Sequence, residues 1–184
     1  MSEREKMLAG ELYLGSDPEL VELRNRARSF MQAYNQTLYD DDPRRRELLQ
    51  GIMGSLGADT NIQTPFFIDY GIHTYLGDKV FLNFNCHILD SAEVHIGDNT
   101  FLATAVQLLT ATHPLLASER IRGPESALPI RIGKNCWLGG GVIVCPGVTI
   151  GDDTTIGAGS VVTKDIPSGV LAVGNPCRVI RKLS

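Results

Sequence analysis

The chain has 184 residues, a formal net charge of −4 and 43% hydrophobic residues. This length predicts one domain, or one domain with a small appendage. The acidic balance disfavours a nucleic-acid-binding protein, which would carry a basic face. No apolar run approaches the ~20 residues of a membrane span, and the charged residues 1–6 have no apolar stretch behind them, unlike a signal peptide. We therefore expect a cytoplasmic protein that binds neither nucleic acid nor membranes.

Residues 1–60 are predicted to form a helical cap. Asp17 and Asp42 are each followed by proline, which is typical of a helix start because the aspartate caps backbone N–H groups and proline fits the first turn. The helix that begins near Asp42 is expected to end at Gly57. The cap's arginines most simply form a solvated helix face: Arg24, Arg26 and Arg28.

An aliphatic residue recurs at every sixth position across residues 132–162: Ile132, Leu138, Val144, Ile150, Ile156 and Val162. Neither a helix nor a strand pair has this period, whereas a solenoid of short stacked repeats does. Three hexads would complete one coil of a triangular prism, with the aliphatic residues pointing inside. The glycine that follows several of them predicts a tight corner with positive φ.

The same period begins near Thr64, includes Tyr70 as an inward position, and slips by two residues before Ile96, which indicates a bulge or a longer corner. Continued from Leu108 it falls on residues that an apolar prism would not bury: Pro114, Arg120 and Ser126. We therefore predict an excursion loop over about 114–130, within a β-helix that spans residues 61–184 and ends in a basic C-terminal tail. A long ordered excursion predicts a functional loop.

The four cysteines form no CxxC pair: Cys86, Cys136, Cys145 and Cys177. Cys86 and Cys136 occupy inward hexad positions, where a thiol behaves as a small hydrophobe. We therefore expect neither a disulfide nor a zinc site.

His113 is the best catalytic candidate among the residues themselves. It closes the hexad that Leu108 opens, so strand alternation points it away from the prism, at the mouth of the excursion. Pro114 favours an extended backbone at His113. A histidine in this place can act as a general base near neutral pH. The alternative is a hinge histidine with no chemistry.

Several motifs beyond the hexads carry a family resemblance: Leu8-Ala-Gly-Glu-Leu-Tyr13, Asp69-Tyr70-Gly71, Asn83-Phe-Asn85, Thr110-Ala-Thr-His113 and Gly174-Asn-Pro-Cys-Arg178. With them the chain resembles, over nearly its whole length, the maltose and galactoside O-acetyltransferases. This group of hexapeptide-repeat acyltransferases includes the nodulation-type sugar acetyltransferases. The resemblance implies a mainly β fold, a left-handed parallel β-helix, assembled as a homotrimer with active sites between subunits.

The resemblance also implies acetyl transfer from acetyl-CoA to a sugar hydroxyl with no metal. His113 would be the general base for direct attack on the thioester, and Asn83 would stabilise the oxyanion. The competing mechanism is a ping-pong route through a cysteine, for which Cys145 is the candidate. The implied acceptor-binding residues are Asp69, Tyr70, Asn83, Asp90 and Glu125. A purely structural alternative is that Asp69 and Asp90 only satisfy corner amides.

Two positions depart from the galactoside enzymes. Gly15 stands where they carry an acidic sugar ligand, although Asp17 lies nearby, and Ser91 replaces a second aspartate. These changes leave the acceptor open among glucose, maltose, a galactoside, a chitooligosaccharide and a non-sugar alcohol.

The resemblance implies an acetyl-CoA site formed by a groove-lining tryptophan, small residues at corners, and polar or cationic residues at the nucleotide end: Trp137, Gly140, Ala158, Thr163, Lys164, Arg178 and Arg181. Gly140 and Ala158 would let the pantetheine arm approach the backbone, while Lys164, Arg178 and Arg181 could pair with phosphates. The alternative for these cations is a basic tail that neutralises the acidic body.

Three other assignments fit the sequence less well. A γ-type carbonic anhydrase needs three histidines on one zinc ion, whereas His73, His87 and His95 are scattered over the corners. A xenobiotic acetyltransferase shares the hexads and the catalytic histidine but lacks this N-terminal helical start. A non-catalytic scaffold does not explain an excursion that begins at a histidine. Bound zinc, drug acetylation and failure to bind acetyl-CoA would identify these alternatives, respectively.

Overall fold

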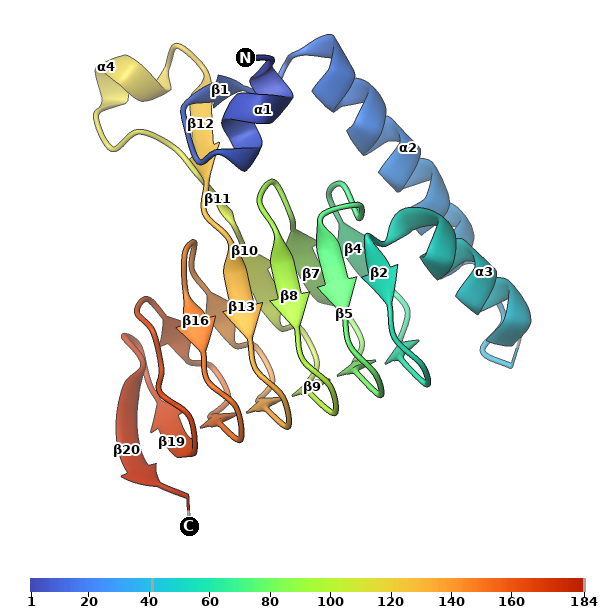
Figure 1. Cartoon of the computed structure of the whole chain (residues 1–184), viewed down its shortest axis with the longest axis vertical. Coiled ribbons are helices and arrows are strands. Elements are labelled where there is room, and N and C mark those ends of the chain that lie inside the picture. The colour runs from blue at the N-terminus through green and yellow to red at the C-terminus, as the bar shows by residue number, and fades with distance from the viewer. Residues whose placement is uncertain (41, 184) are drawn as a thin grey trace.

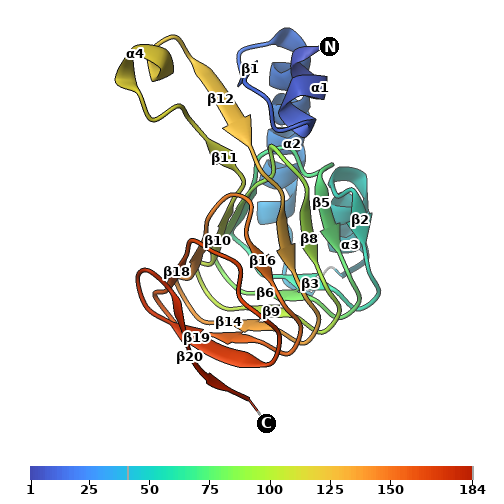
Figure 2. The same cartoon turned by 60° about the vertical axis from the view of Figure 1, so that its left-hand side comes forward.

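A three-sided prism of short parallel strands forms the body of the protein in this computed structural model, which describes residues 1–40 and 42–183 (Figure 1). The chain passes from face 1 to face 2 to face 3 and then begins the next coil. Figure 2 shows these coils stacked along one axis, with the longer helices at the N-terminal end and a hairpin that projects from one side beside the start of the chain. None of the helices in the described part of the chain is long and apolar enough to cross a membrane.

Each face is one ladder of strands. Face 1 contains β2 Ser55–Leu56, β5 Thr74–Leu76, β8 Val94–Ile96, β13 Ile130–Ile132 and β16 Thr149–Ile150. Face 2 contains β3 Asn61–Ile62, β6 Phe81–Leu82, β9 Phe101–Leu102, β14 Trp137–Leu138, β17 Thr155–Ile156, β19 Val170–Val173 and β20 Arg178–Lys182. Face 3 contains β4 Phe66–Ile68, β7 Cys86–Leu89, β10 Gln107–Leu109, β15 Ile143–Val144 and β18 Val161–Val162.

Stacked aliphatic side chains fill the prism, as the hexads predicted. On face 1, Leu76, Ile96, Ile132 and Ile150 pair in register from coil to coil and are all buried. Each such side chain contributes about 1.5–3 kcal/mol when it is removed from water. Tyr70, which the period placed inside the prism, lies outside this core. It belongs to a second buried cluster with Met7, Tyr13 and Leu20 of the N-terminal segment.

The corner glycines serve a different purpose from the one predicted. A positive φ occurs two residues after Gly97, at Asn99 (φ 56°), and not at the glycine itself. Gly97 is required because the next coil is so close: a β-carbon there would lie 2.7 Å from the carbonyl carbon of Gly133. These glycines therefore set the spacing between coils.

The helices α2 Pro18–Asn35 and α3 Asp42–Ile52 cover the N-terminal end of the prism, whereas α1 Glu3–Leu8 lies beside the excursion (Figure 1). Asp17 caps α2 by accepting a hydrogen bond from the Glu19 N–H, as predicted. The expected end of α3 at Gly57 and the start of the solenoid near Thr64 are wrong. The helix ends at Ile52 because the chain then docks on the next coil, with Gly57 N–H donating to Leu76 O at 2.9 Å.

The excursion is a structured hairpin. It leaves the prism as β11 Ala111–Thr112, turns through the short helix α4 Ala117–Arg120 and returns as β12 Pro124–Ala127. The N-terminal strand β1 Tyr13–Leu14 pairs antiparallel with β12, so β1, β12 and β11 form one sheet, here called the rim sheet. At the other end, the predicted basic tail is no free tail: β20 pairs antiparallel with β19.

Candidate active site

Two edges of the prism carry the predicted site residues. The long-turn edge is formed by the turns from face 3 to face 1, and the excursion leaves from it. The small-residue edge is formed by the turns from face 2 to face 3. Because all face 3 strands run from the small-residue edge to the long-turn edge, the two edges lie a strand length apart.

His113 lies on the long-turn edge, just after β11, and is exposed. Its Nδ1 lies 3.2 Å from the carbonyl oxygen of Pro124, across the excursion hairpin. A carbonyl oxygen only accepts hydrogen bonds, so the neutral ring carries its proton on Nδ1 and its lone pair on Nε2. This tautomer leaves Nε2 available as a base.

Glu125 and Tyr13 share one row of the rim sheet. They are directly paired across β1 and β12. The pairing of β12 with β11 matches Thr112 to Ser126, so the next step of the same register sets His113 opposite Glu125. Directly opposed residues in antiparallel strands project from the same face of the sheet. Tyr13, Glu125 and His113 therefore follow one another across the rim sheet.

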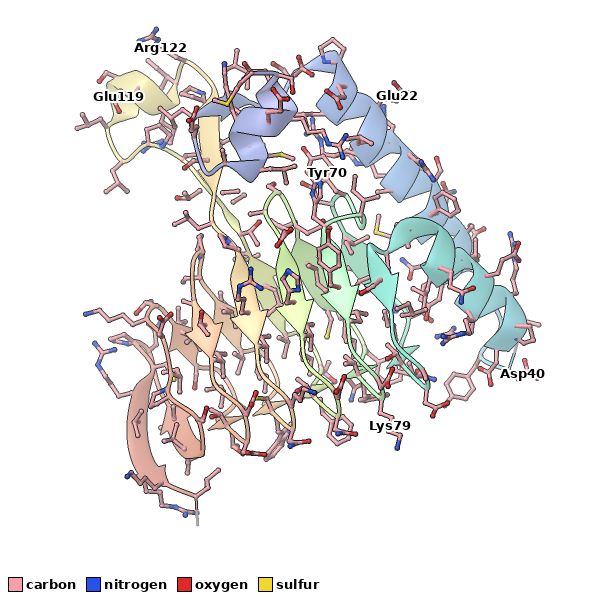
Figure 3. All side chains as sticks on the ribbon, in the orientation of Figure 1. Glu22, Asp40, Tyr70, Lys79, Glu119 and Arg122 are labelled. Atoms are coloured by element: carbon pink, nitrogen blue, oxygen red, sulfur yellow. The ribbon has the colours of Figure 1, made fainter. Side chains whose placement is uncertain are left out.

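Arg24 joins the cap to the prism beside this row. Its guanidinium donates to the Tyr70 hydroxyl and to the Gly15 carbonyl oxygen. Figure 3 shows Tyr70 between the prism and the N-terminal helices. Burial raises the pKa of Tyr70 to about 12, so its hydroxyl stays protonated. The predicted solvated role is therefore wrong for Arg24, which is a site residue that the helical pattern did not reveal.

Asp69 is half-buried next to this cluster. Burial raises the pKa of its carboxyl, and the nearby charges of Arg24 and Arg28 act in the opposite direction. A carboxylate thus lies near the guanidinium that contacts the Tyr70 phenol, at one corner of the long-turn edge. Polar groups of these kinds can donate hydrogen bonds to hydroxyl groups and accept hydrogen bonds from them.

Asp90 is fully buried and makes only internal hydrogen bonds. One carboxylate oxygen accepts from the Tyr70 N–H at 2.8 Å, and the other accepts from the Thr74 hydroxyl at 3.0 Å. Ser91 beside it is also buried. In the single chain these contacts match the structural alternative for Asp90, which holds the turn that carries Tyr70.

Asn83 lies on the small-residue edge, in the turn between β6 and β7. Its side-chain oxygen accepts from the Phe84 N–H at 2.7 Å, and its backbone N–H donates to Leu102 O at 2.9 Å. Within residues 1–40 and 42–183 nothing accepts a hydrogen bond from its side-chain NH₂. That group is of the type that stabilises an oxyanion.

Gly140 and Ala158 lie further along the same edge, where Gly159 N–H donates to Gly140 O at 2.9 Å. A β-carbon on Gly141 or Gly159 would meet no atom within 4 Å, so this stretch is open backbone. Trp137 lies beside it on β14 and is half-exposed. An exposed edge with small side chains fits the approach of a slender ligand.

The remaining predicted cofactor residues lie elsewhere. Thr163 and Lys164 follow β18 on the long-turn edge, while Arg178 and Arg181 are exposed on β20. β7 spans four residues, so a face 3 strand separates the edges by roughly 13 Å at ~3.3 Å per residue. One chain therefore brings together neither His113 with Asn83 nor the two groups of cofactor residues.

Cys145, the candidate for a covalent route, is half-buried, and burial raises the pKa of its thiol. A raised pKa disfavours the thiolate that nucleophilic attack requires. No group of three or more potential metal ligands occurs in the described part of the chain.

Known families match both parts of the chain. A model described as the maltose acetyltransferase hexapeptide capping motif matches residues 6–57, and one described as bacterial transferase hexapeptide (six repeats) matches residues 129–164. A crystal structure of a maltose O-acetyltransferase from Clostridium difficile is 45% identical, with a TM-score of 0.98 over 100% of this chain and 98% of that one. The chain belongs to the maltose and galactoside acetyltransferase family of hexapeptide-repeat proteins.

Two further structures of this family are similar. A galactoside acetyltransferase in complex with coenzyme A is 37% identical, with a TM-score of 0.96 over 100% of this chain and 92% of its own. A hexapeptide-repeat acetyltransferase from Vibrio cholerae, complexed with acetyl-CoA, is 37% identical over 100% of both chains, with a TM-score of 0.92. The predicted family and fold class are confirmed, and the protein is an acetyltransferase of the hexapeptide-repeat type.

Proposed function

We propose that the protein transfers the acetyl group of acetyl-CoA directly to a sugar hydroxyl, with His113 as the general base. The observation that carries this proposal is the Nδ1 contact with Pro124 O, which leaves Nε2 free to accept a proton. Two relatives at 37% identity were solved with coenzyme A or acetyl-CoA, which supports this donor. The maltose and galactoside relatives support a sugar as the acceptor.

In the proposed reaction, His113 first takes a proton from the acceptor hydroxyl and later gives it to the departing thiolate. Nε2 of His113 removes the proton of the acceptor hydroxyl as its oxygen forms a bond to the thioester carbon. The negative charge on the carbonyl oxygen is stabilised by the side-chain NH₂ of Asn83. When the C–S bond breaks, the departing thiolate takes the proton from the His113 imidazolium, so the products are the acetyl ester and CoA thiol.

Two copies of the chain are needed for one such site. His113 belongs to the long-turn edge and Asn83 to the small-residue edge, and a face 3 strand separates them. A groove between the long-turn edge of one subunit and the small-residue edge of its neighbour would unite them. The same groove would unite Gly140, Ala158 and Trp137 with Thr163 and Lys164 for the donor. We therefore propose a homotrimer, as the family resemblance implies, with Arg178 and Arg181 at its nucleotide end.

The acceptor would lie at the rim sheet, near Asp69, Tyr70 and Glu125. Asp90 would act there only indirectly, because its contacts fix the backbone of Tyr70. The raised pKa of Cys145 favours direct transfer over a ping-pong route.

The test is release of CoA thiol from acetyl-CoA across glucose, maltose, a galactoside, a chitooligosaccharide and chloramphenicol. We expect turnover on a sugar, and His113→Ala should lower kcat/KM by about 10²–10⁴ while the Kd for acetyl-CoA is unchanged. His95→Ala is the matched control, since His95 lies on face 1 and contacts Glu93. Unaltered turnover in His113→Ala would contradict the assignment of His113 as the general base. Turnover on chloramphenicol alone would indicate a xenobiotic acetyltransferase. Failure to bind acetyl-CoA would indicate a non-catalytic scaffold.

A further inference from the structure

An open cavity of about 450 Å³ lies at the N-terminal end of the prism, on the edge formed by the turns from face 1 to face 2. Its walls come mainly from α3 and from the turn between β2 and β3 (Figure 1). None of the residues of the proposed active site lies on this edge. The volume falls within the range of small-molecule sites, roughly 300–1,000 Å³. Charged side chains of both signs line the cavity: Asp42, Arg45, Arg46 and Asp59.

Arg45 is the buried cation of this cavity, with only 5% of its surface exposed. Its Nη2 donates to Ile62 O at 2.6 Å and to the Tyr34 hydroxyl at 3.0 Å. Its Nη1 donates to the Thr37 hydroxyl at 3.1 Å. Burial raises the pKa of Tyr34 to about 12, although the charge of Arg45 acts in the opposite direction, so the phenol stays neutral. Uncharged oxygens therefore fix the guanidinium in place without neutralising it.

The charged groups around the cavity are not paired with one another. In the part of the chain that the structure describes, no ion pair within 4.0 Å involves Asp42, Arg45, Arg46 or Asp59. Arg46 reaches the Gly57 carbonyl oxygen, at 3.4 Å from each Nη atom.

These contacts leave the two guanidiniums able to bind a ligand. A buried cation without a counter-charge costs free energy. The hydrogen bonds of Arg45 use three of the five N–H groups that a guanidinium carries. A carboxylate is the group that the planar fork of arginine matches. The cavity thus offers a place for one negative group at the arginines and for one positive group at the aspartates.

We propose that this cavity binds a small zwitterion of the amino-acid type, with its carboxylate at Arg45 and Arg46 and its ammonium group at Asp42 and Asp59. A simple anion would be repelled by the two aspartates, and a simple amine would leave the buried guanidinium without a counter-charge. A bound zwitterion would join α3 to the first coil, because its two charged ends would contact both walls. The site would therefore link the stability of the cap to the concentration of its ligand, whatever reaction the enzyme catalyses.

The experiment titrates the full-length protein with the standard L-amino acids and follows the unfolding temperature Tm and the heat of binding. We expect at least one of them to raise Tm by about 5–10 °C at roughly 100 times its Kd. The N-acetyl derivative of the best ligand lacks the ammonium group, and its α-carboxamide lacks the carboxylate. Each derivative should bind about ten- to a hundredfold more weakly than the amino acid.

Variants then assign the two charged ends. Arg46→Gln should raise the Kd of the amino acid about ten- to a hundredfold, and Asp59→Asn should reduce its advantage over the N-acetyl derivative. Arg44→Gln is the matched control, because Arg44 is exposed on the same helix and lies outside the lining of the cavity. Arg45→Gln is the less decisive variant, since Arg45 also holds the Ile62 carbonyl.

Three results would overturn the inference. The first is that no amino acid binds or raises Tm. The second is that both derivatives bind as tightly as the amino acid itself. The third is that Arg46→Gln and Asp59→Asn bind the amino acid and its derivatives as the parent and Arg44→Gln do, which would place the ligand elsewhere on the protein.

Discussion

Replacing Asp90 with asparagine should change how stability depends on pH. Burial raises the pKa of Asp90 from 3.8 to about 6, although the Tyr70 N–H and the Thr74 hydroxyl partly stabilise the carboxylate. Between these two values the folded protein keeps a proton that the unfolded chain has lost. Stability contributed by this residue is therefore fully present below about pH 4 and declines as the pH rises to about 6.

The size of this decline follows from the two pKa values. Each pKa unit corresponds to about 1.36 kcal/mol, so the rise from 3.8 to about 6 corresponds to at most about 3 kcal/mol. Asparagine has nearly the same shape and does not ionise. Its oxygen can accept from the Tyr70 N–H, and its NH₂ can donate to the Thr74 hydroxyl. The Asp90→Asn variant should therefore gain on the parent as the pH rises from 4 to 7.

Urea unfolding at pH 4, 5, 6 and 7, at one fixed protomer concentration, measures this difference. The free energy of unfolding of the variant minus that of the parent should rise by about 2–3 kcal/mol over the range. Contributions from other titrating groups cancel in the difference. A difference that stays constant with pH would refute the reasoning. Because Asp90 is fully buried, the acceptor KM of the variant should also match that of the parent, whereas a raised KM would restore Asp90 as an acceptor ligand.

Two further predictions concern assembly and packing. Co-expression of His113→Ala and Asn83→Ala chains should restore activity that neither variant has alone, because a mixed trimer contains sites with an intact His113 from one chain and an intact Asn83 from another; mixed trimers with no activity would assign both residues to one chain. Gly97→Ala should lower the free energy of unfolding by about 1–3 kcal/mol, because the new carbon would lie 2.7 Å from the Gly133 carbonyl carbon. Gly140→Ala, with its nearest contact at 3.4 Å, is the control, and equal unfolding midpoints in urea would contradict the packing argument.

The prism could be predicted from the sequence because its contacts repeat. Each inward side chain packs on its equivalent in the next coil, so the six-residue period of aliphatic residues predicts most of the buried positions. The same period did not reveal where the solenoid starts, since Ser55 and Leu56 form a strand only by pairing with β5. It also placed Tyr70 inside the prism, whereas the N-terminal segment buries it in a separate cluster.

The site was only partly predictable for a related physical reason. His113 could be found because the period breaks there. The role of Arg24 could not, since its partners Tyr70 and Gly15 come from distant parts of the chain and its own spacing on the helix resembles that of exposed arginines. The close approach of the Glu125 side chain to Gly15 depends on the pairing of β1 with β12 at two positions more than a hundred residues apart. Such short strands leave no periodic signal in the sequence.

The rim sheet can vary in sequence independently of the prism. It is built from the N-terminal segment and the excursion hairpin, and neither contributes a strand to the three faces of the prism. If the acceptor binds at the rim sheet, as proposed, substitutions in β1 or β12 would alter acceptor binding while the coils and the open edge beside Gly140 stay unchanged. Under the proposed function, part of the acceptor site and the donor edge would therefore be encoded in different stretches of the chain, so acceptor specificity could be varied at the rim sheet without changing the donor edge.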